Sequence, residues 1–253
     1  MDREEILRKT KEQLRSSYSA EDFLQHSSQT LDDLDEVINV LFEHLRNWYS
    51  IYLPEVSKVE DREVYLEIAE KYVRGDEKSL SILSSKARSV LPKKESVGSP
   101  ATEKDVEILR SFARRIHELM KLRDEICKYR DETANKIARN LSYLLEPALA
   151  TKLIVEAHGL KRLANLPASS IQVLGAEKAL FMHLTKNTKP PKHGIIFLHP
   201  LMRGATKQKR GKIARLLAAK ISIAAKADAY SKNFIAPNLK AELERKVEEV
   251  LKK

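Results

Sequence analysis

The feature that most constrains this chain is a run of apolar residues spaced alternately three and four positions apart. The run consists of Leu31, Leu34, Ile38, Leu41, Leu45, Trp48 and Tyr52. Such a heptad stripe is typical of a helix that packs against another helix along its length. Pro54 follows, and proline ends a helix because its ring clashes with the preceding turn and it lacks an N–H group. The sequence therefore predicts one long helix that needs a partner.

A second long helix with similar spacing is predicted to begin after Thr102, which can form a capping box with Asp105. Its apolar residues are Leu109, Phe112, Ile116, Leu119, Leu122, Ile126, Tyr129, Ile137, Leu141 and Leu144. A helix of some 40 residues would be about 60 Å long, and such a helix is unstable in water unless its stripe is covered. We therefore expect a long antiparallel coiled-coil hairpin. Its insert would hold two short helices within 61–90, broken at Gly75, and a loop over Pro92–Pro100.

Shorter helices are expected after Pro147, which suits a first helical turn. We place them at about 147–157, 160–165, 168–184 and 206–229 and from Pro237 onward, with a loop over 189–194 and an apolar run over 195–198. Only 7 glycines and 9 prolines in 253 residues also favour helices. The predicted fold class is all-α, with a coiled-coil dimerisation domain and its helical insert at 1–145 and a compact helical domain at 146–253.

Basic residues are concentrated in the second domain. Residues 1–150 contain 25 Lys and Arg against 29 Asp and Glu, whereas residues 151–253 contain 21 against 7, a net charge of +14. Nucleic acid is the expected partner of such a domain, and a membrane surface is the alternative. No apolar run is long enough to span a membrane, and the charged N-terminus has no apolar signal core. We expect the cytoplasm, or the nucleolus in a eukaryote.

Residues for catalysis or for binding a metal ion are not grouped in this sequence. The seven histidines lack the spacing of a zinc site, and Cys127 is the only cysteine. Between residues 151 and 236 the acidic residues are Glu156, Glu177 and Asp228. Paired carboxylates for acid–base chemistry are therefore not expected there. We predict no catalytic residue, metal site or cofactor, and a binding protein rather than an enzyme.

The basic residues of 203–226 alternate with apolar ones at helical spacing. A helix here would dock by its apolar face and present Lys209, Lys212 and Lys220 on the opposite side, where they suit a phosphate backbone. The preceding loop contains Lys192, His193 and Gly194. A cation, a flat ring and a bare backbone together suit a distorted or single-stranded RNA element.

This region contains three ordered motifs: GAEKALF at Gly175–Phe181, PKHGIIFLHP at Pro191–Pro200 and RGKIAR at Arg210–Arg215. They resemble motifs of the Nop-domain family of box C/D guide ribonucleoproteins, especially its archaeal scaffold proteins. Upstream, LDDLD and LRNWY resemble the family's coiled-coil helix, so the resemblance covers about residues 15–235. Departures include Met182, where family members usually have arginine, and the segment 203–209, which lacks the family's proline and tryptophan.

The resemblance implies an RNA-binding scaffold in a particle that guides RNA 2′-O-methylation. The coiled coil would pair two copies of the chain, and the Nop domain would grip a kink-turn RNA already bound by a small ribosomal-protein-like subunit. The implied RNA contacts are Lys192, His193, Gly194, Arg210, Lys212 and Arg215. The implied composite RNA–protein surface is Gly175, Ala176, Glu177, Lys178 and Phe181.

Two other functions remain open from the sequence. One is the related spliceosomal Nop-domain factor, whose loop we would expect to depart further from Lys192-His193-Gly194. The other is a coiled-coil adaptor with non-specific RNA binding, which predicts no selectivity for kink-turn RNA. Competition between kink-turn and unrelated RNA in a gel shift would distinguish the adaptor from the scaffold.

The resemblance also generates a prediction about fibrillarin, the methyltransferase that the family's N-terminal domain recruits. Only about 15 residues precede the coiled-coil-like segment. We therefore expect fibrillarin to bind this chain weakly or not at all, and the purified chain not to methylate RNA or bind S-adenosylmethionine. Gel filtration of the two proteins together checks this, and a stable complex would contradict it.

Overall fold

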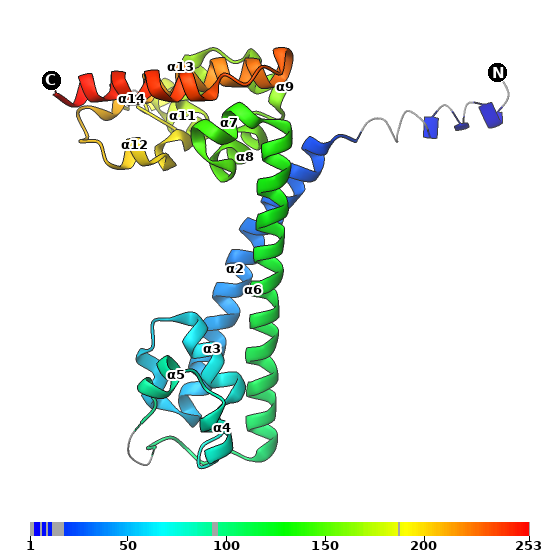
Figure 1. The fold of residues 1–253 in the computed structure, drawn as a ribbon, viewed down its shortest axis with the longest axis vertical. Helices are drawn as coiled ribbons and strands as arrows, with labels where there is room; N and C mark the ends of the chain where they lie inside the picture. Colours follow the sequence, from blue (N-terminus) through cyan, green and yellow to red (C-terminus); the bar gives the residue numbers. More distant parts are fainter. Residues whose placement is uncertain are drawn as a thin grey trace. The chain divides into compact units, whose positions relative to one another are not determined.

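The computed structural model describes residues 3–5, 7–8, 10–11, 18–92, 96–186 and 188–252, and every regular element in these ranges is helical (Figure 1). The predicted all-α fold class is therefore confirmed. Residues 93–95 of the expected insert loop, and much of the charged N-terminus, lie outside the described residues. Within the described ranges, no helix has both the length and the apolar character that crossing a membrane requires.

Contacts divide the chain into two compact units. Unit 2 is Thr30–Ile126, and unit 1 combines Met1–Gln29 with Cys127–Lys253. Helices α2 (Ala20–Tyr52) and α6 (Glu103–Ile137) contribute residues to both units. Residues 127–145, which the apolar pattern assigns to the coiled-coil part, pack with the C-terminal helices.

Within unit 2, α2 and α6 run antiparallel. The amide N of Ser99, just before α6, donates to the carbonyl O of Ile51 near the end of α2 at 2.9 Å. Further along, the guanidinium of Arg123 binds the carboxylate of Asp35 at 2.9 Å. The two helices end and begin where the sequence indicates. Helix α2 stops at Tyr52, and the Thr102 hydroxyl accepts from the Asp105 amide while the Asp105 carboxylate accepts from the Thr102 amide.

The insert contains more helices than the sequence pattern predicts. A 3₁₀ helix, η1 (Pro54–Lys58), is followed by α3 (Arg62–Lys71), α4 (Glu77–Ser81) and α5 (Ser85–Val90). Asp61, Asp76 and Ser84 each accept hydrogen bonds from backbone N–H groups in the first turn of the helix that follows them. Because these caps start a new helix each time, 61–90 forms three helices rather than two.

The buried face of α2 also differs from the predicted stripe. Trp48 is 45% exposed, whereas Phe42 and Tyr49 are buried. Both rings pack edge-on against Tyr65 of α3, with centroid distances of 5.3 Å and 5.9 Å. The prediction for Trp48 is wrong because the insert covers a second side of α2. Its buried face is therefore wider than the seam of two helices alone.

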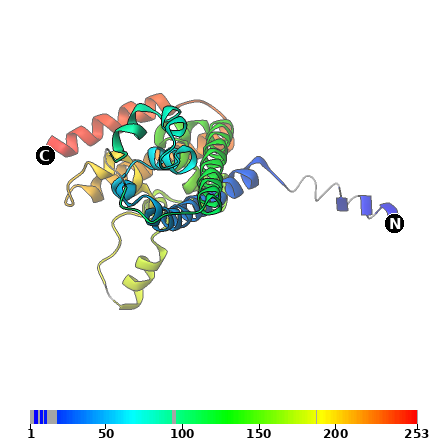
Figure 2. The same ribbon diagram turned by 90° about the horizontal axis from the view of Figure 1, so that it is seen from below.

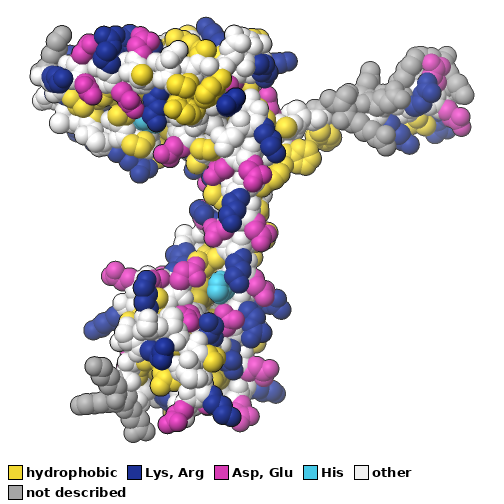
Figure 3. Space-filling model, viewed as in Figure 1, with side chains coloured by type: hydrophobic (Ala, Val, Ile, Leu, Met, Phe, Trp, Pro, Cys, Tyr) yellow, Lys and Arg dark blue, Asp and Glu magenta, His cyan; other side chains and the backbone are white. Residues whose placement is uncertain are grey.

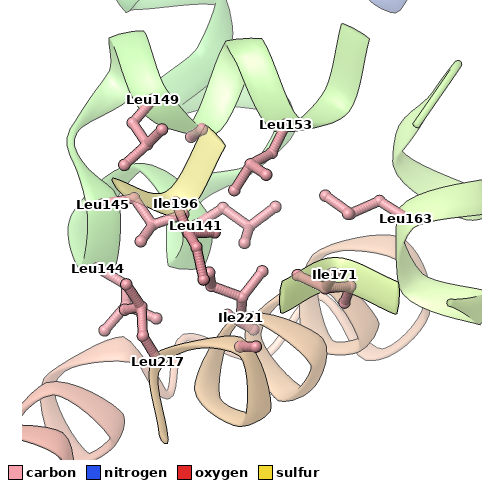
Figure 4. Close-up of a cluster of buried hydrophobic side chains, with 14 of the residues drawn as sticks. Leu141, Leu144, Leu145, Leu149, Leu153, Leu163, Ile171, Ile196, Leu217 and Ile221 are labelled. Atoms are coloured by element: carbon pink, nitrogen blue, oxygen red, sulfur yellow. The ribbon is translucent and has the colours of Figure 1, made fainter. Parts of the chain in front are cut away.

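Unit 1 is a cluster of mostly short helices that pack around a central one. In order they are α7 (Arg139–Leu145), α8 (Pro147–Glu156), α9 (Leu160–Asn165), α10 (Ala168–Val173), α11 (Glu177–Lys186), η2 (Ile195–Leu198), α12 (Pro200–Arg203), α13 (Arg210–Lys226), η3 (Ala227–Ser231) and α14 (Ala236–Lys252). Helix α13 packs against α7, α9, α10 and α14. Its Leu217 and Ile221 lie in the core with Leu141, Ile171 and Ile196 (Figure 4).

Three predicted helices have different bounds from those expected. The helix predicted over 168–184 divides at Gly175, which adopts a φ of +79° that a helix cannot contain. The helix predicted over 206–229 begins at Arg210, and its last turn is the π-helix η3. The second long helix breaks at Ala138, which leaves helical geometry with a φ of −133° and a ψ of 60°.

The break at Ala138 is stabilised by a buried carboxylate from the other end of unit 1. Asp228, in η3, accepts from the amide N of Asn140 and the amide N of Leu141, both at 2.9 Å. Its carboxylate also accepts from Asn140 Nδ2 at 2.7 Å. Asn140 Oδ1 in turn accepts from the amide N atoms of Ile235 and Ala236, where α14 starts. This network caps α7 and α14 together.

Asp228→Ala should therefore destabilise unit 1. It would leave two buried backbone N–H groups without an acceptor, and we expect a loss of roughly 3 kcal/mol. Hydrogen exchange at the amides of Asn140 and Leu141 reports the change locally. The matched control is Asp124→Ala, on an exposed part of α6. Equal protection of the two amides in wild type and Asp228→Ala would contradict the capping role.

Candidate nucleic-acid interface

The residues just before the first family-like motif contact the second motif through backbone hydrogen bonds. The amide N of Gly194 donates to the carbonyl O of Gln172 at 2.9 Å, and that of Ile195 donates to Leu174 O at 2.8 Å. The Gln172 side chain also donates from Nε2 to the carbonyl O of Lys192 at 2.7 Å. The end of α10 and the loop before η2 are thus joined over several residues.

Two glycines allow these segments to approach closely. A Cβ on Gly194 would lie 1.8 Å from Leu174 O, which no side chain tolerates. A Cβ on Gly175 would lie 2.4 Å from Ile195 Cγ1, and its positive φ also disfavours any other residue. The glycines of the two motifs therefore keep them in contact, and this contact positions Lys192 and His193.

Between these segments the chain leaves the body of unit 1 as an arm, which we define as residues 177–193 (residue 187 is outside the described ranges). Figure 2 shows α11 and the following loop standing out from the rest of the unit. No residue of α11 is buried, and Phe181 and Leu184 are 67% and 75% exposed. The Glu177 carboxylate accepts from the amide N of Gly175 at 2.8 Å and holds the first turn.

The arm and its base contain the residues that the family resemblance assigns to a composite RNA–protein surface. Gly175, Ala176 and Glu177 lie at its base, and Lys178 and Phe181 lie on the first turns of α11. An exposed aromatic ring and an exposed lysine on a projecting helix form an accessible surface. The structure thus places these five residues within one short segment.

The ring of His193 is held in a stack. It lies parallel to the ring of Phe197, with centroids 4.6 Å apart and planes 13° from parallel. The Arg210 guanidinium lies 5.0 Å from the centroid of Phe197, and Arg210 Nε donates to Ala205 O at 3.0 Å. Partial burial lowers the pKa of His193 below its usual 6.5, and the charges of Arg210 and Lys192 lower it further. Both effects favour the neutral form of the ring.

Exposed cations lie on this loop and on the first turns of α13. Lys192, Lys212 and Arg215 are exposed. The first turn of α13 contains no acidic residue, although the N-terminus of a helix favours negative charge. The cations near the N-terminus of α13 and the positive end of its dipole both favour an anion. This helix end is therefore suited to bind a phosphate.

Two cations that the sequence pattern places on the same face are used inside the protein. Lys220 is 7% exposed, and its Nζ lies 2.5 Å from the Glu242 carboxylate of α14. The ammonium groups of Lys220 and Lys246 lower the pKa of Glu242 to about 2. Lys209 Nζ donates to the carbonyl O of Leu251 at 2.7 Å. The expectation for Lys220 is wrong because α14 covers that side of α13, and Lys209 contacts the end of α14.

The outer surface of α14 carries acidic and basic side chains side by side (Figure 3). A surface of mixed charge attracts a phosphate backbone less than one of uniform positive charge. The cations of α13 that remain available are therefore those turned away from α14.

Phe197 and Gln172 belong to this site, but the sequence predicts no role for either of them. Phe197 is part of the apolar run and of the PKHGIIFLHP motif, and an aromatic ring four residues after His193 is within reach for stacking. Gln172 carries no sequence pattern that would identify it, since its contact with Lys192 depends on the meeting of the two motifs.

Residues 30–252 match the family model Nop, described as "snoRNA binding domain, fibrillarin". The chain belongs to the Nop family. This confirms the resemblance carried by the three motifs, all of which lie within the matched range. Because the match begins at residue 30, it includes most of α2 and all of α6 as well as the helices of unit 1.

Other members of the Nop family are similar over most of the chain. An uncharacterized NOP5 family protein of Methanocaldococcus jannaschii is 41% identical over 237 residues, covering 89% of this chain and 56% of that protein. Nucleolar protein 56 of Dictyostelium discoideum is 37% identical over 215 residues, covering 80% of this chain and 40% of that protein. This chain thus spans about half the length of the curated relatives it matches.

A solved structure has the same fold as this Nop chain. The crystal structure of a fibrillarin/Nop5p complex aligns with a TM-score of 0.56 and 30% sequence identity. The alignment covers 97% of this chain and 78% of the other.

The position of Arg210 generates a prediction for the titration of His193. In the wild-type chain the pKa of His193 should lie below 6.5, because burial and the charge of Arg210 both disfavour the imidazolium. Arg210→Gln should raise it toward 6.5 by removing one of these causes. An NMR titration of the histidine ring protons measures both values. A pKa for His193 that is unchanged by Arg210→Gln would contradict the contact.

Proposed function

We propose that this chain is an RNA-binding scaffold of a box C/D ribonucleoprotein that guides RNA 2′-O-methylation. In this proposal it recognises a kink-turn RNA together with the protein already bound to that RNA. The observation that carries the proposal is the His193–Phe197–Arg210 stack, which lies beside exposed cations and at the base of the projecting arm. The membership of the Nop family and the similarity to a protein solved with fibrillarin support it.

The RNA contacts divide by their chemistry. His193 offers a flat ring, which suits an unstacked base. Gly194 lies beside it, and the lack of a side chain there would let RNA approach, although its N–H and C=O groups bond within the chain. Lys192, Lys212 and Arg215 offer charge to phosphates, which adds affinity without sequence selectivity. Arg210 supports the stack on Phe197 and adds charge to the same surface.

The protein contact is proposed for the arm. A kink-turn-binding, ribosomal-protein-like subunit would meet Phe181 and Lys178 on α11 while the RNA meets the loop. The arm and the loop are joined where α10 meets the segment before η2, so they form one continuous surface. The RNA would cover only the loop part of this surface, and the protein would cover only the arm. Recognition should therefore depend on both partners being present, and selectivity for the RNA–protein complex follows from this.

A second copy of the chain is the proposed partner of unit 2. The insert covers one side of α2 and α6, where Phe42 and Tyr49 are buried. Other apolar side chains of the two helices stay exposed, and they recur at helical spacing: Val37, Trp48 and Ile51 on α2, and Ile108 and Leu122 on α6. Trp48 and Ile51 lie close to Asp105 and Leu109 of α6 around a shared cavity of about 100 Å³. A paired hairpin would bury this stripe at about 25 cal/mol per Å² of apolar surface.

The chain should therefore sediment as a homodimer. The double substitution Val37→Glu and Ile51→Glu places two charges on the stripe and should give monomers, because burying unpaired carboxylates is unfavourable. The control is Ile82→Glu, which adds a charge at a residue that is 58% exposed on the insert. Analytical ultracentrifugation at tens of micromolar measures the outcome, and a monomeric wild type would contradict the dimer.

Substitutions at the interface should separate the proposed contacts. His193→Ala should weaken binding by on the order of 1–3 kcal/mol if the ring stacks on a base. Lys212→Ala should weaken binding modestly and reduce the salt dependence by about one unit. Glu177→Ala should leave binding of free RNA unchanged and reduce recruitment to the RNA–protein complex. Gel shifts with kink-turn RNA, with and without its primary binding protein, measure all three.

The matched control for Lys212→Ala is Lys104→Ala, an exposed lysine of unit 2. Two results would contradict the proposed function. The first is equal affinity for kink-turn RNA with and without its first protein. The second is a His193→Ala variant that is recruited to the RNA–protein complex as well as the wild type. Equal affinity of the wild type for kink-turn RNA and unrelated RNA would instead indicate a non-specific adaptor.

A further inference from the structure

A second group of polar and aromatic side chains lies at the far end of α13 from the loop. The exposed face of α13 runs from Lys212 and Arg215 through Ala219 and Ile223 to Lys226, at steps of three and four residues. The first η3 turn then brings Tyr230 to the surface, where it is 57% exposed. From Lys212 to Tyr230 the face extends about 27 Å at 1.5 Å per residue.

The Tyr230 ring is fixed rather than free. Its hydroxyl donates to Asn165 Oδ1 of α9 at 2.7 Å. The π-helix makes this possible, since the amide N of Lys232 donates to Ala227 O, five residues back. The extra residue in the turn lets Asp228 point into the core while Tyr230 reaches α9. An exposed ring that is anchored by its hydroxyl loses little freedom when a flat group stacks on it.

Three exposed cations lie on the helical faces that lead to this ring. Lys161 and Arg162 precede Asn165 by four and three residues, so they lie on the same side of α9. Both are exposed, as is Lys226, one turn before Tyr230. The carboxylate of Glu21 accepts from the amide N of Leu160 at 3.0 Å and fixes the first turn of α9. Asp228, the acidic residue closest in sequence to Tyr230, is 3% exposed and faces the core.

We propose that Tyr230, with Lys161, Arg162 and Lys226, is a second RNA contact that binds single-stranded RNA leading away from the kink-turn. The ring would stack on a base, and the three cations would bind flanking phosphates. This platform, which we call the Tyr230 platform, lies on the same helix as Lys212 and Arg215. One RNA strand could follow the exposed face of α13 from the first contact to the second. The inference rests on the proposed function of the first site.

The test compares three RNAs, each bound by the primary kink-turn protein. One has no extension, and the others carry a single-stranded uridine extension of about ten nucleotides at the 3′ or the 5′ end. The wild-type chain should bind one of the extended RNAs roughly tenfold more tightly than the unextended RNA. Tyr230→Ala should remove this gain and leave binding of the unextended RNA unchanged.

Two further variants distinguish stacking from structural damage. Tyr230→Phe loses the hydrogen bond to Asn165 just as Tyr230→Ala does, but it keeps the ring and should retain most of the gain. Arg162→Ala should lower the salt dependence of binding the extended RNA by about 0.7 units, as expected for one phosphate of a single strand. Lys104→Ala removes a charge of the same sign from unit 2 and should change nothing.

Three results would overturn the proposal. The first is that neither extension increases the affinity of the wild-type chain for the RNA–protein complex. The second is that Tyr230→Ala keeps the full gain in affinity that the extension gives the wild type. If Tyr230→Ala weakens the binding of extended and unextended RNA equally, Tyr230 contacts the kink-turn or its protein and not the extension. If the wild type fails to bind any of the complexes, the proposed function is what has failed. The platform is then tested with a free uridine oligonucleotide, whose affinity for wild type and Tyr230→Ala must differ.

Discussion

Unit 1 depends on one buried carboxylate. Asp228 caps α7 from a turn 88 residues later in the chain, and its partner Asn140 caps the start of α14. Removing a carboxylate from water is unfavourable, and the hydrogen bonds from three N–H groups offset that cost. The consequence reaches the surface. Because α14 is held at its first turn, it lies over one side of α13 and occupies Lys209 and Lys220, so the cations of α13 that stay available are those on the opposite side.

The close approach of two backbone segments decides where the candidate site is. Gly194 lies so near Leu174 that no side chain fits, and Gly175 has the same relation to Ile195. These contacts hold the base of the arm and the loop of Lys192 and His193 together. The arm itself buries no residue of α11, so its stability comes from this base and not from packing of its own helix. A projecting segment of this kind is suited to contact with a partner, since it can be reached without disturbing the core.

Net charge alone is a poor guide to which surface meets RNA. The second half of the sequence has a strong positive excess, yet part of that charge neutralises carboxylates or caps backbone carbonyls within unit 1. The remaining cations are ordered along one face of α13, with an aromatic group near each end. At the first end, His193 is stacked on Phe197, and at the second, Tyr230 is anchored to Asn165. Aromatic rings fixed among cations are what single-stranded nucleic acid requires, because bases stack while phosphates need charge.

Local chemistry was enough to predict much of this protein from its sequence. Several features depend only on residues close together in the chain. They are the all-α class, the end of α2 before Pro54, the capping box of Thr102 and Asp105, and the three motifs of the Nop family. The tertiary structure decided what depends on distant residues. Trp48 is exposed and Tyr49 buried because the insert packs on α2, and Lys220 is paired because α14 covers it. Ala138 breaks a helix because Asp228 supplies a cap from far along the chain. Apolar periodicity in the sequence indicates that one face of a helix is covered. It does not indicate which element covers that face, because this depends on packing between segments that are distant in sequence. The same packing decides which side chains remain exposed for a partner.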